Sequence, residues 1–264
     1  MAPDRSLRDT FDTTAARYHA ARPDYPEALF DDLVAETGLQ PAARLLEVGC
    51  GTGKATVPLA RRGFHITAVE LGPALAAEAA RNVAPYGDVE VETANFETWL
   101  PSAKAGFDLV YSATAWHWID PAIKYDKAAA LLAPGGHIAI WGAGHGFPPD
   151  YDPFFAEIQD VYEELGEGHP GGWRPVPPDE LHDGSAELEA SGRFETVAVR
   201  RYVWALRYDA DSYLALLDTF SGHIAMAPDK RDRLYGEIRR RLATRDDGSL
   251  TRHWAAVLTI GRRL

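Results

Sequence analysis

A glycine-rich turn between an apolar run and a helical pattern constrains this fold more than any other feature. Residues 44–48 have the composition of a short buried strand, and the turn that contains Gly49, Gly51 and Gly53 follows them directly. Glycine lets a backbone turn sharply and lets a ligand approach it closely. A strand, such a turn and a helix in this order indicate a βαβ unit that binds a nucleotide-like ligand.

Strand-like and helical patterns alternate along the first half of the chain, as in a parallel sheet covered on both faces. Strands are expected at residues 44–48, 65–70, 89–93, 107–112 and 137–141. Helices are expected at residues 55–62, 73–83 and 121–132. The predicted fold class is therefore α/β, with a Rossmann-like doubly wound sheet whose binding loops gather at the carboxyl edge of the strands.

The second half of the chain has a different pattern. Residues 142–192 are rich in proline and glycine, and we expect a loop-rich excursion over the active face. Strand patterns return at residues 194–204 and 253–262, with helical patterns at 210–220 and 228–243. The last strand pair predicts an antiparallel C-terminal edge on the mostly parallel sheet, interrupted by a helical insertion.

These patterns predict one domain over residues 1–264 with three kinds of part. A cofactor-binding core takes residues 40–145, and helical and loop insertions at 146–192 and 205–250 form a cap over the carboxyl edge. Residues 1–35 form an N-terminal entrance helix region. We find no internal repeat.

The spacing of the glycine-rich turn narrows the ligand. It is G-x-G-x-G, and Lys54 stands where the dinucleotide fingerprint G-x-G-x-x-G has its third glycine. A phosphate-binding G-x-x-x-x-G-K-[ST] loop does not occur either. Glu70 ends the second expected strand, where a carboxylate can accept hydrogen bonds from both hydroxyls of a ribose. The turn and Glu70 together favour a nucleoside-containing cofactor.

At these residues the chain resembles the class I S-adenosylmethionine-dependent methyltransferases. Their first motif is an acidic residue followed by G-x-G-x-G, matched here by Glu47 and the turn. Residues 107–112 (FDLVYS) and 131–136 (LLAPGG) look like the family's fourth-strand and fifth-strand motifs. Residues 11–26 are similar to the entrance helix of small-molecule, trans-aconitate methyltransferase-like members. The resemblance implies S-adenosyl-L-methionine as cofactor, S-adenosyl-L-homocysteine as product and a small-molecule methyl acceptor.

The resemblance also implies roles for single residues around the cofactor. The three glycines would line its methionine and ribose portion, Glu47 would orient its amino group, and Glu70 would bind the ribose. The side chains expected at the adenine or elsewhere along the cofactor are Leu71, Asn95, Phe96, Ser112 and Trp116. This chain has Asn95 where the family has an acid, and an amide can both donate and accept hydrogen bonds.

Two N-terminal residues, Tyr18 and Arg22, would reach the cofactor carboxylate. A guanidinium suits that task because it forms paired charge-assisted hydrogen bonds with a carboxylate. Without the resemblance, a surface ion pair is the simpler interpretation of Arg22.

His117 is the candidate general base, since it follows the fourth expected strand and imidazole titrates near neutral pH. A purely structural role between Trp116 and Trp118 remains open. His145 and His223 are weaker candidates, and no ligand spacing indicates a metal site. Seven aromatic residues suggest an apolar acceptor pocket: Tyr25, Trp116, Trp118, Trp141, Trp173, Tyr213 and Phe220.

Charge and cysteine content bear on partners and location. The formal net charge of −12 disfavours a nucleic-acid partner, because binding to a phosphate backbone relies on clustered cations. Cys50 is the single cysteine, so no disulfide forms within the chain. We find no long apolar segment and expect a cytoplasmic protein without a membrane anchor. The oligomeric state stays open.

Three alternatives to methyl transfer remain at this stage. One is a protein that binds the same cofactor and catalyses another reaction, such as a cyclisation, because a fold does not determine chemistry. An NAD(P)-dependent oxidoreductase shares the strand, turn and acidic residue, although Lys54 disfavours it. A non-catalytic interaction module would leave the nucleotide pocket unexplained.

Overall fold

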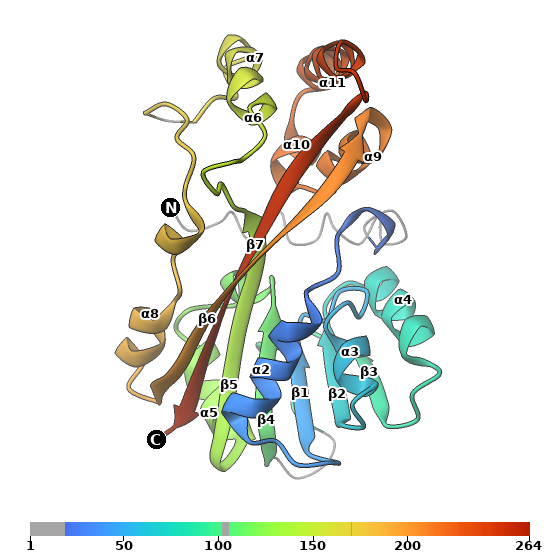
Figure 1. Cartoon of the computed structure of the whole chain (residues 1–264). Helices are drawn as coiled ribbons and strands as arrows, with labels where there is room; N and C mark the ends of the chain where they lie inside the picture. Colours follow the sequence, from blue (N-terminus) through green and yellow to red (C-terminus); the bar gives the residue numbers. More distant parts are fainter. Residues whose placement is uncertain (1–18, 102–105, 170) are drawn as a thin grey trace.

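The computed structural model describes residues 19–101, 106–169 and 171–264. In this part of the chain, seven strands form one sheet in the order β3-β2-β1-β4-β5-β7-β6 (Figure 1). The strands are β1 (Arg44–Val48), β2 (His65–Glu70), β3 (Val89–Thr93), β4 (Phe107–Ala113), β5 (Leu132–His145), β6 (Phe194–Asp209) and β7 (Ser249–Arg263).

The first five strands pair in parallel, whereas β7 runs antiparallel to both of its neighbours, β5 and β6. This arrangement confirms the predicted fold class of a mostly parallel, doubly wound sheet with an antiparallel edge. The C-terminal strand lies inside that edge, and β6 is the outermost strand.

Helices cover both faces of the sheet. On one face lie α2 (Glu27–Thr37), α3 (Thr56–Ala60) and α4 (Pro73–Val83), and on the other lie α5 (Lys124–Leu131) and α8 (Ser185–Ala190). Neighbouring residues of β1 serve opposite faces: Leu45 packs in the α2–α3 layer and Leu46 in the α5–α8 layer. Burial on both faces explains why the central strands are continuous apolar runs.

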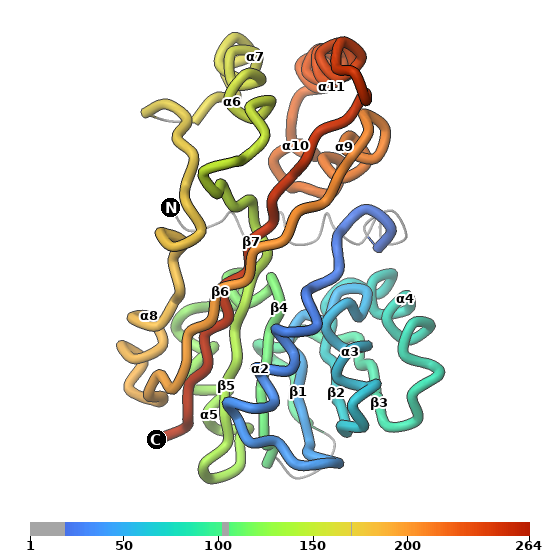
Figure 2. Tube along the Cα trace, viewed as in Figure 1, coloured from blue at the N-terminus to red at the C-terminus, as the bar shows by residue number. Residues whose placement is uncertain are grey.

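A long two-stranded ribbon carries the cap. The pairing of β6 with β7 runs from Phe194↔Arg263 to Asp209↔Ser249, so the ribbon extends well beyond the parallel strands (Figure 2). Its upper end holds α9 (Ala210–Leu217), α10 (Ser221–Ala225) and α11 (Pro228–Ala243).

The cap has a hydrophobic core of its own. The side chains of Phe154, Leu216, Leu234 and Trp254 are buried together in a cluster separate from those of the sheet. The cluster joins helices α6 (Phe154–Glu157), α7 (Gln159–Glu164), α9 and α11 with the ribbon. The helical insertion expected between the last two strands is therefore part of the cap.

The proline- and glycine-rich segment after β5 differs from the irregular excursion that the sequence suggested. It contains α6 and α7 in the cap and then descends beside the sheet to η3 (Pro178–Glu180) and α8 (Figure 1). Leu188 of α8 is fully buried against the sheet face that α5 covers, so this part does not lie over the carboxyl edge. Helices of four to six residues are too short to show a helical hydrophobic period in the sequence.

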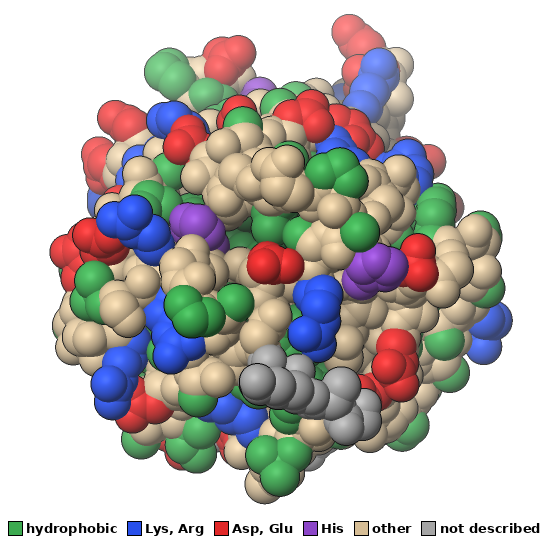
Figure 3. All heavy atoms as spheres, turned by 90° about the horizontal axis from the view of Figure 1, so that it is seen from below, with side chains coloured by type: hydrophobic (Ala, Val, Ile, Leu, Met, Phe, Trp, Pro, Cys, Tyr) green, Lys and Arg blue, Asp and Glu red, His purple; other side chains and the backbone are tan. Residues whose placement is uncertain are grey.

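The outer surface at the amino ends of the strands carries acidic and basic side chains interspersed (Figure 3). Among the described residues, no helix is long and apolar enough to cross a lipid bilayer.

Candidate active site

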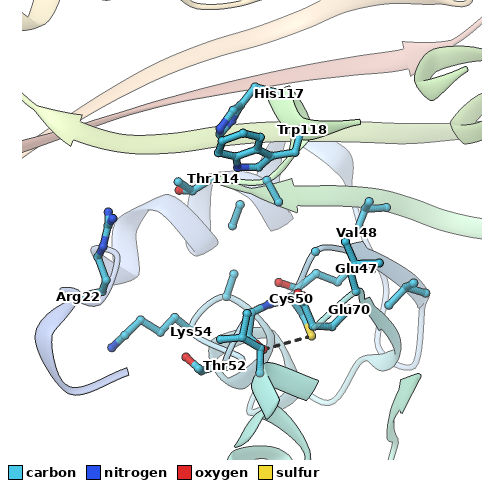
Figure 4. Close-up of a pocket in the computed structure, with 18 of the residues that line it drawn as sticks. Arg22, Glu47, Val48, Cys50, Thr52, Lys54, Glu70, Thr114, His117 and Trp118 are labelled. Carbon is cyan, nitrogen blue, oxygen red and sulfur yellow. Dashed lines mark hydrogen bonds between the residues drawn. The ribbon is translucent and has the colours of Figure 1, made fainter. Parts of the chain in front are cut away.

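A cavity of about 350 Å³ lies between the carboxyl edge of the sheet and the cap. Its floor comes from the turn after β1, the end of β2 and the segment after β3. The segment after β4 and the cap residues Phe220, Ser221 and Trp254 close the other side. In Figure 4, His117 and Trp118 lie above the glycine-rich turn, with Arg22 and Lys54 to one side. The parallel strands bring these segments together because their carboxyl ends meet at one edge.

Glycine is required at position 49 for two reasons. Its φ is +71°, in the left-handed region, and a Cβ built there would lie 2.5 Å from Cβ of Ala115. The turn after β1 and the segment after β4 therefore approach each other more closely than a side chain permits.

The Glu70 carboxylate supports the same turn. Oε2 accepts a hydrogen bond from the Gly51 amide at 2.8 Å, and Oε1 accepts one from the Gly72 amide at 2.9 Å. These two bonds hold the carboxylate at the end of β2. Each carboxylate oxygen can accept further bonds, so Glu70 can also receive ribose hydroxyls.

Glu47 is a buried carboxyl at the end of β1. Its Oε2 accepts hydrogen bonds from Thr56 Oγ1 at 2.6 Å and from the Tyr111 hydroxyl at 2.8 Å. Burial raises the pKa of Glu47 to about 7, against the opposing effect of these two hydrogen bonds. A carboxyl so poised is easily ionised by an arriving ammonium group.

The segment after β4 holds a strained residue at the cavity wall. Thr114 has φ +60°, unusual for a β-branched residue. Its hydroxyl lies 2.8 Å from the Tyr25 hydroxyl and accepts a longer bond from the Ala143 amide at 3.3 Å. Such strain is often found where a binding site fixes the backbone.

His117 and Trp118 follow Thr114 within a short 3-10 turn, η2 (Trp116–Trp118), and their ring centroids are 4.8 Å apart. Partial burial of the imidazole, aided by the Lys124 ammonium, lowers the pKa of His117. The ring is therefore neutral near pH 7 and able to accept a proton.

Arg22 faces the cap from the N-terminal side of the cavity. Its Nε donates to Thr219 Oγ1 at 2.8 Å and its Nη2 to the Thr219 carbonyl at 2.9 Å. The guanidinium carbon lies 4.1 Å from the centroid of the Phe220 ring. Lys54 also lines the cavity and forms an ion pair with Asp24 at 2.8 Å.

Most of the residues selected from the sequence do line this cavity. They are Arg22, Glu47, Gly49, Gly51, Glu70, Leu71, Asn95, Phe96 and His117. Tyr18 lies outside the described residues.

Three selected residues do not line the cavity. Ser112 is buried in β4, where its hydroxyl donates to the Val48 carbonyl at 2.8 Å. Trp116 points into the α5 side of the core, against Phe96 and Tyr125. Gly53 turns the chain toward α3 behind the lining residues. Strand pleating and the 3-10 turn decide these directions, and one sequence does not reveal them.

The aromatic set divides in a similar way. Tyr25, Trp118 and Phe220 line the cavity, whereas Trp141, Trp173 and Tyr213 pack elsewhere. Sequence reasoning missed Thr114, Ser221 and Trp254. The position of Thr114 directly after β4 was the available signal for one of them. Trp254 gave none, because it lies within β7, far from any motif. Within the described ranges, no group of three or more His, Cys, Asp or Glu side chains is placed to bind a metal ion.

A protein-family model matches the central part of the chain. Residues 46–140 match the family model described as a methyltransferase domain. This part of the chain thus matches a methyltransferase domain, in agreement with the resemblance and with the S-adenosyl-L-methionine cofactor expected from the sequence. The oxidoreductase alternative gains no support.

Curated relatives match about half of the chain. An uncharacterized methyltransferase of Mycobacterium tuberculosis is 34% identical over 142 residues, covering 52% of this chain and 53% of the relative. A trans-aconitate 2-methyltransferase of the same species is 32% identical over 163 residues, covering 56% of each protein. The chain therefore spans about half the length of the curated relatives it matches.

Solved structures match over nearly the whole chain. A protein from Anaeromyxobacter dehalogenans described as a type II methyltransferase is 26% identical, with a TM-score of 0.64 and coverage of 91% of this chain and 97% of the other. The cyclase SpnF has a TM-score of 0.56 at 16% identity, covering 99% and 97%, which shows a shared fold alone.

Proposed function

We propose that the chain transfers the methyl group of S-adenosylmethionine to a small-molecule acceptor held between the sheet edge and the cap. The continuous cavity is the observation that carries this proposal. It joins the methyltransferase-type turn of residues 49–51 to an apolar wall made by the cap. A methyl donor and an acceptor both need places in one water-excluding space.

The residues at the sheet edge fit the cofactor. Glu47 and Glu70 offer carboxylate oxygens for its amino group and its ribose, and Asn95 with Phe96 lines the part of the cavity assigned to adenine. Arg22 is the assigned partner of its carboxylate. When bound, the cofactor supplies an electrophilic methyl group on a sulfonium sulfur. Residues 40–145 are accordingly assigned as the cofactor-binding core.

His117 is assigned as the general base. It lies in the segment after β4, and its lowered pKa leaves Nδ1 or Nε2 free of a proton at neutral pH. An oxygen, nitrogen or carbon acceptor that loses a proton on methylation would pass it to this ring. In-line displacement requires little other chemistry from the protein, so the remaining residues align the acceptor and exclude water.

The acceptor is a small organic molecule with an apolar portion. Tyr25, Trp118 and Phe220 offer rings to it, and the cavity is too small for a macromolecule to enter as a whole. The net charge of −12 argues against a nucleic-acid acceptor. One buried cysteine and no disulfide favour the cytoplasm as the place of action, which cell fractionation would test.

The decisive experiment has two stages. Titration calorimetry of the folded protein with S-adenosylmethionine and S-adenosylhomocysteine should show binding of both. A metabolite extract with methyl-labelled cofactor should then yield a labelled small molecule. No binding by folded protein would overturn the proposal.

A second candidate keeps the cofactor and replaces methyl transfer with another reaction. The nearly full-length fold match to a cyclase gives it a basis, although 16% identity supports the fold alone. Transfer of label to any acceptor would decide for methyl transfer. Conversion of an acceptor without transfer of label would decide for the second candidate.

A further inference from the structure

The cap holds a buried cation beside the acceptor end of the cavity. Arg252 of β7 is 6% exposed, although it carries a guanidinium. The ionisable groups that act on it most strongly are Tyr213, which is hydrogen-bonded to it, Tyr208 and Arg22, and none of them is a carboxylate. A buried charge without an opposite charge is costly, and proteins normally pair such groups.

Apart from Arg22, the side chains around this guanidinium include several aromatic rings. Its carbon lies 4.5 Å from the Trp254 ring centroid and 5.6 Å from that of Phe220. Cation–π contacts of this kind compensate part of the desolvation. Burial and the Arg252 charge both lower the pKa values of His145 and His223, so these imidazoles favour the neutral form and add no second positive charge.

Two polar atoms in this region lack a hydrogen-bond partner within the described residues. They are Arg252 Nε and His145 Nε2, both buried. His145 pairs with Trp254 across the β5–β7 ladder, and Trp254 is two residues from Arg252 on the same face of β7. Buried polar atoms are nearly always satisfied, so two unpartnered atoms on one face of the β5–β7 pair suggest a ligand.

Arg252 is directly behind the cavity wall. Both rings that it contacts, Phe220 and Trp254, line the cavity, and Arg22 contacts the Phe220 ring as well. Because both distances run to one centroid, the two guanidinium carbons are at most about 10 Å apart. Arg252 therefore places a positive charge behind the cap wall of the cavity, although the whole chain is acidic.

The negative side chains of the cavity lie at its other end. Glu47 and Glu70 belong to the ends of β1 and β2, whereas Arg252 and Phe220 belong to the cap. The two carboxylates lie where the cofactor is assigned, together with Lys54, which is paired with Asp24, and the Arg252 guanidinium lies behind the wall where the acceptor is assigned. Such an arrangement orients a ligand that is anionic at one end.

We infer that Arg252 binds an oxyanion group, a carboxylate or a phosphate, on an acceptor whose apolar body packs against Phe220 and Trp254. The inference rests on the proposed function and adds the charge of the substrate class to it. Phe220 lines the cavity and contacts the Arg252 guanidinium, so a small movement of its ring would open the cavity to Arg252. Charge-assisted pairing then satisfies the Arg252 Nε donor, which has no hydrogen-bond partner among the described residues.

The test uses aromatic probes that differ in charge. Calorimetry is carried out on the full chain saturated with S-adenosylhomocysteine, with benzoate, phenyl phosphate and the neutral amide benzamide. We expect at least one of the two anions to bind at least about tenfold more tightly than benzamide, because one charged hydrogen bond contributes that much to affinity. The better of the two anions identifies the oxyanion.

Variants connect this preference to Arg252. Arg252→Met keeps the length of the side chain and should bind benzoate, phenyl phosphate and benzamide alike, whereas Arg252→Lys should keep part of the preference. Arg262→Met removes an exposed arginine of the same strand, paired with Glu195, and should leave the preference unchanged. Circular dichroism and the affinity for S-adenosylhomocysteine verify that each variant is folded.

The outcomes separate this inference from the proposed function. Loss of S-adenosylhomocysteine binding in the wild-type protein contradicts the proposed function itself. Cofactor binding without any preference for the anions contradicts the oxyanion site alone. An unchanged preference in folded Arg252→Met, or equal binding of all probes to the wild type, means that Arg252 only stabilises the cap.

Discussion

The two ends of the cavity are built in different ways. The sheet edge uses short segments that directly follow strands, and its key contacts are backbone amides on carboxylates, such as Gly51 on Glu70. The cap uses side chains from distant parts of the chain, such as Phe220 and Trp254, held by their own aromatic core. The sheet-edge end, to which we assign the cofactor, therefore depends on local backbone geometry, and the cap end, to which we assign the acceptor, depends on long-range packing.

This contrast has a functional consequence. Backbone turns after parallel strands recur wherever the fold recurs, so the same cofactor can be bound by many related chains. A cap formed by separate packing can change without disturbing that turn. We expect variants at the sheet edge to alter cofactor binding and variants in the cap to alter acceptor binding.

The largest expected effect is at the border between the two ends. His117→Gln should lower kcat about a hundredfold, because it removes general-base catalysis. With the pKa of His117 lowered, wild-type kcat should stay level near pH 7 and fall only below pH 6.5 as the ring gains a proton. His65→Gln, on the exposed amino end of β2, is the control. An acidic limb that persists in His117→Gln means that another group is the base.

The next effect concerns the sheet edge. Glu70→Ala should weaken S-adenosylhomocysteine binding about thirtyfold, since charged hydrogen bonds contribute about 2 kcal/mol. Acceptor selectivity at saturating cofactor should not change. Glu90→Ala, an exposed carboxylate on neighbouring β3, should bind like the wild type in calorimetry. Unchanged affinity in folded Glu70→Ala refutes the ribose assignment.

The free energy of unfolding can test how closely the turn after β1 approaches the segment after β4. Gly49→Ala should lower the free energy of unfolding by about 2 kcal/mol more than Gly63→Ala, because overpacking adds to the left-handed strain. Gly63 has a similar φ of +81°, but its added Cβ meets no atom within 4 Å. Urea unfolding of both variants gives the difference. Equal losses contradict the close contact with Ala115.

A cap variant should show the opposite pattern to Glu70→Ala. Phe220→Leu should raise the KM of the acceptor about fivefold by removing part of an apolar wall, with little change in cofactor affinity. Phe154→Leu is matched to it, because Phe154 belongs to the same aromatic cluster but does not line the cavity. It should reduce thermal stability and leave KM unchanged. If Phe220→Leu changes cofactor affinity more than the KM of the acceptor, the two ends of the cavity do not act separately.

The smallest effect is a pH dependence of cofactor affinity. Because the pKa of Glu47 is raised to about 7, ionisation between pH 6.5 and 7.5 should strengthen S-adenosylhomocysteine binding about threefold. Glu47→Gln should abolish the dependence. The stability contribution of the neutral carboxyl is present at acidic pH and is lost as pH rises through about 7, so the wild type should lose stability relative to Glu47→Gln. Parallel pH profiles for both proteins contradict this pKa.

Sequence patterns located the sheet edge closely. The ranges expected for β1, β2, β3 and α4 match those observed, because buried parallel strands and an amphipathic helix leave strong periodic signals. The same patterns underestimated β5, whose upper half, including Gly142 and Gly144, continues as a partner of β7. Glycine weakens a strand signal, and pairing with a distant strand restores the strand.

The sequence by itself determined the class of fold, the expected cofactor and two carboxylates that line the cavity, since each of these follows from residues a few positions apart. Only the tertiary structure showed that Ser112 and Trp116 point away from the cavity and that Trp254 and Arg252 approach it. Pleating and twist of the β6–β7 ribbon decide which side chains face inward. Pleating and twist depend on the pairing of two strands that are separated by about forty residues in the chain, and no local sequence pattern records this pairing.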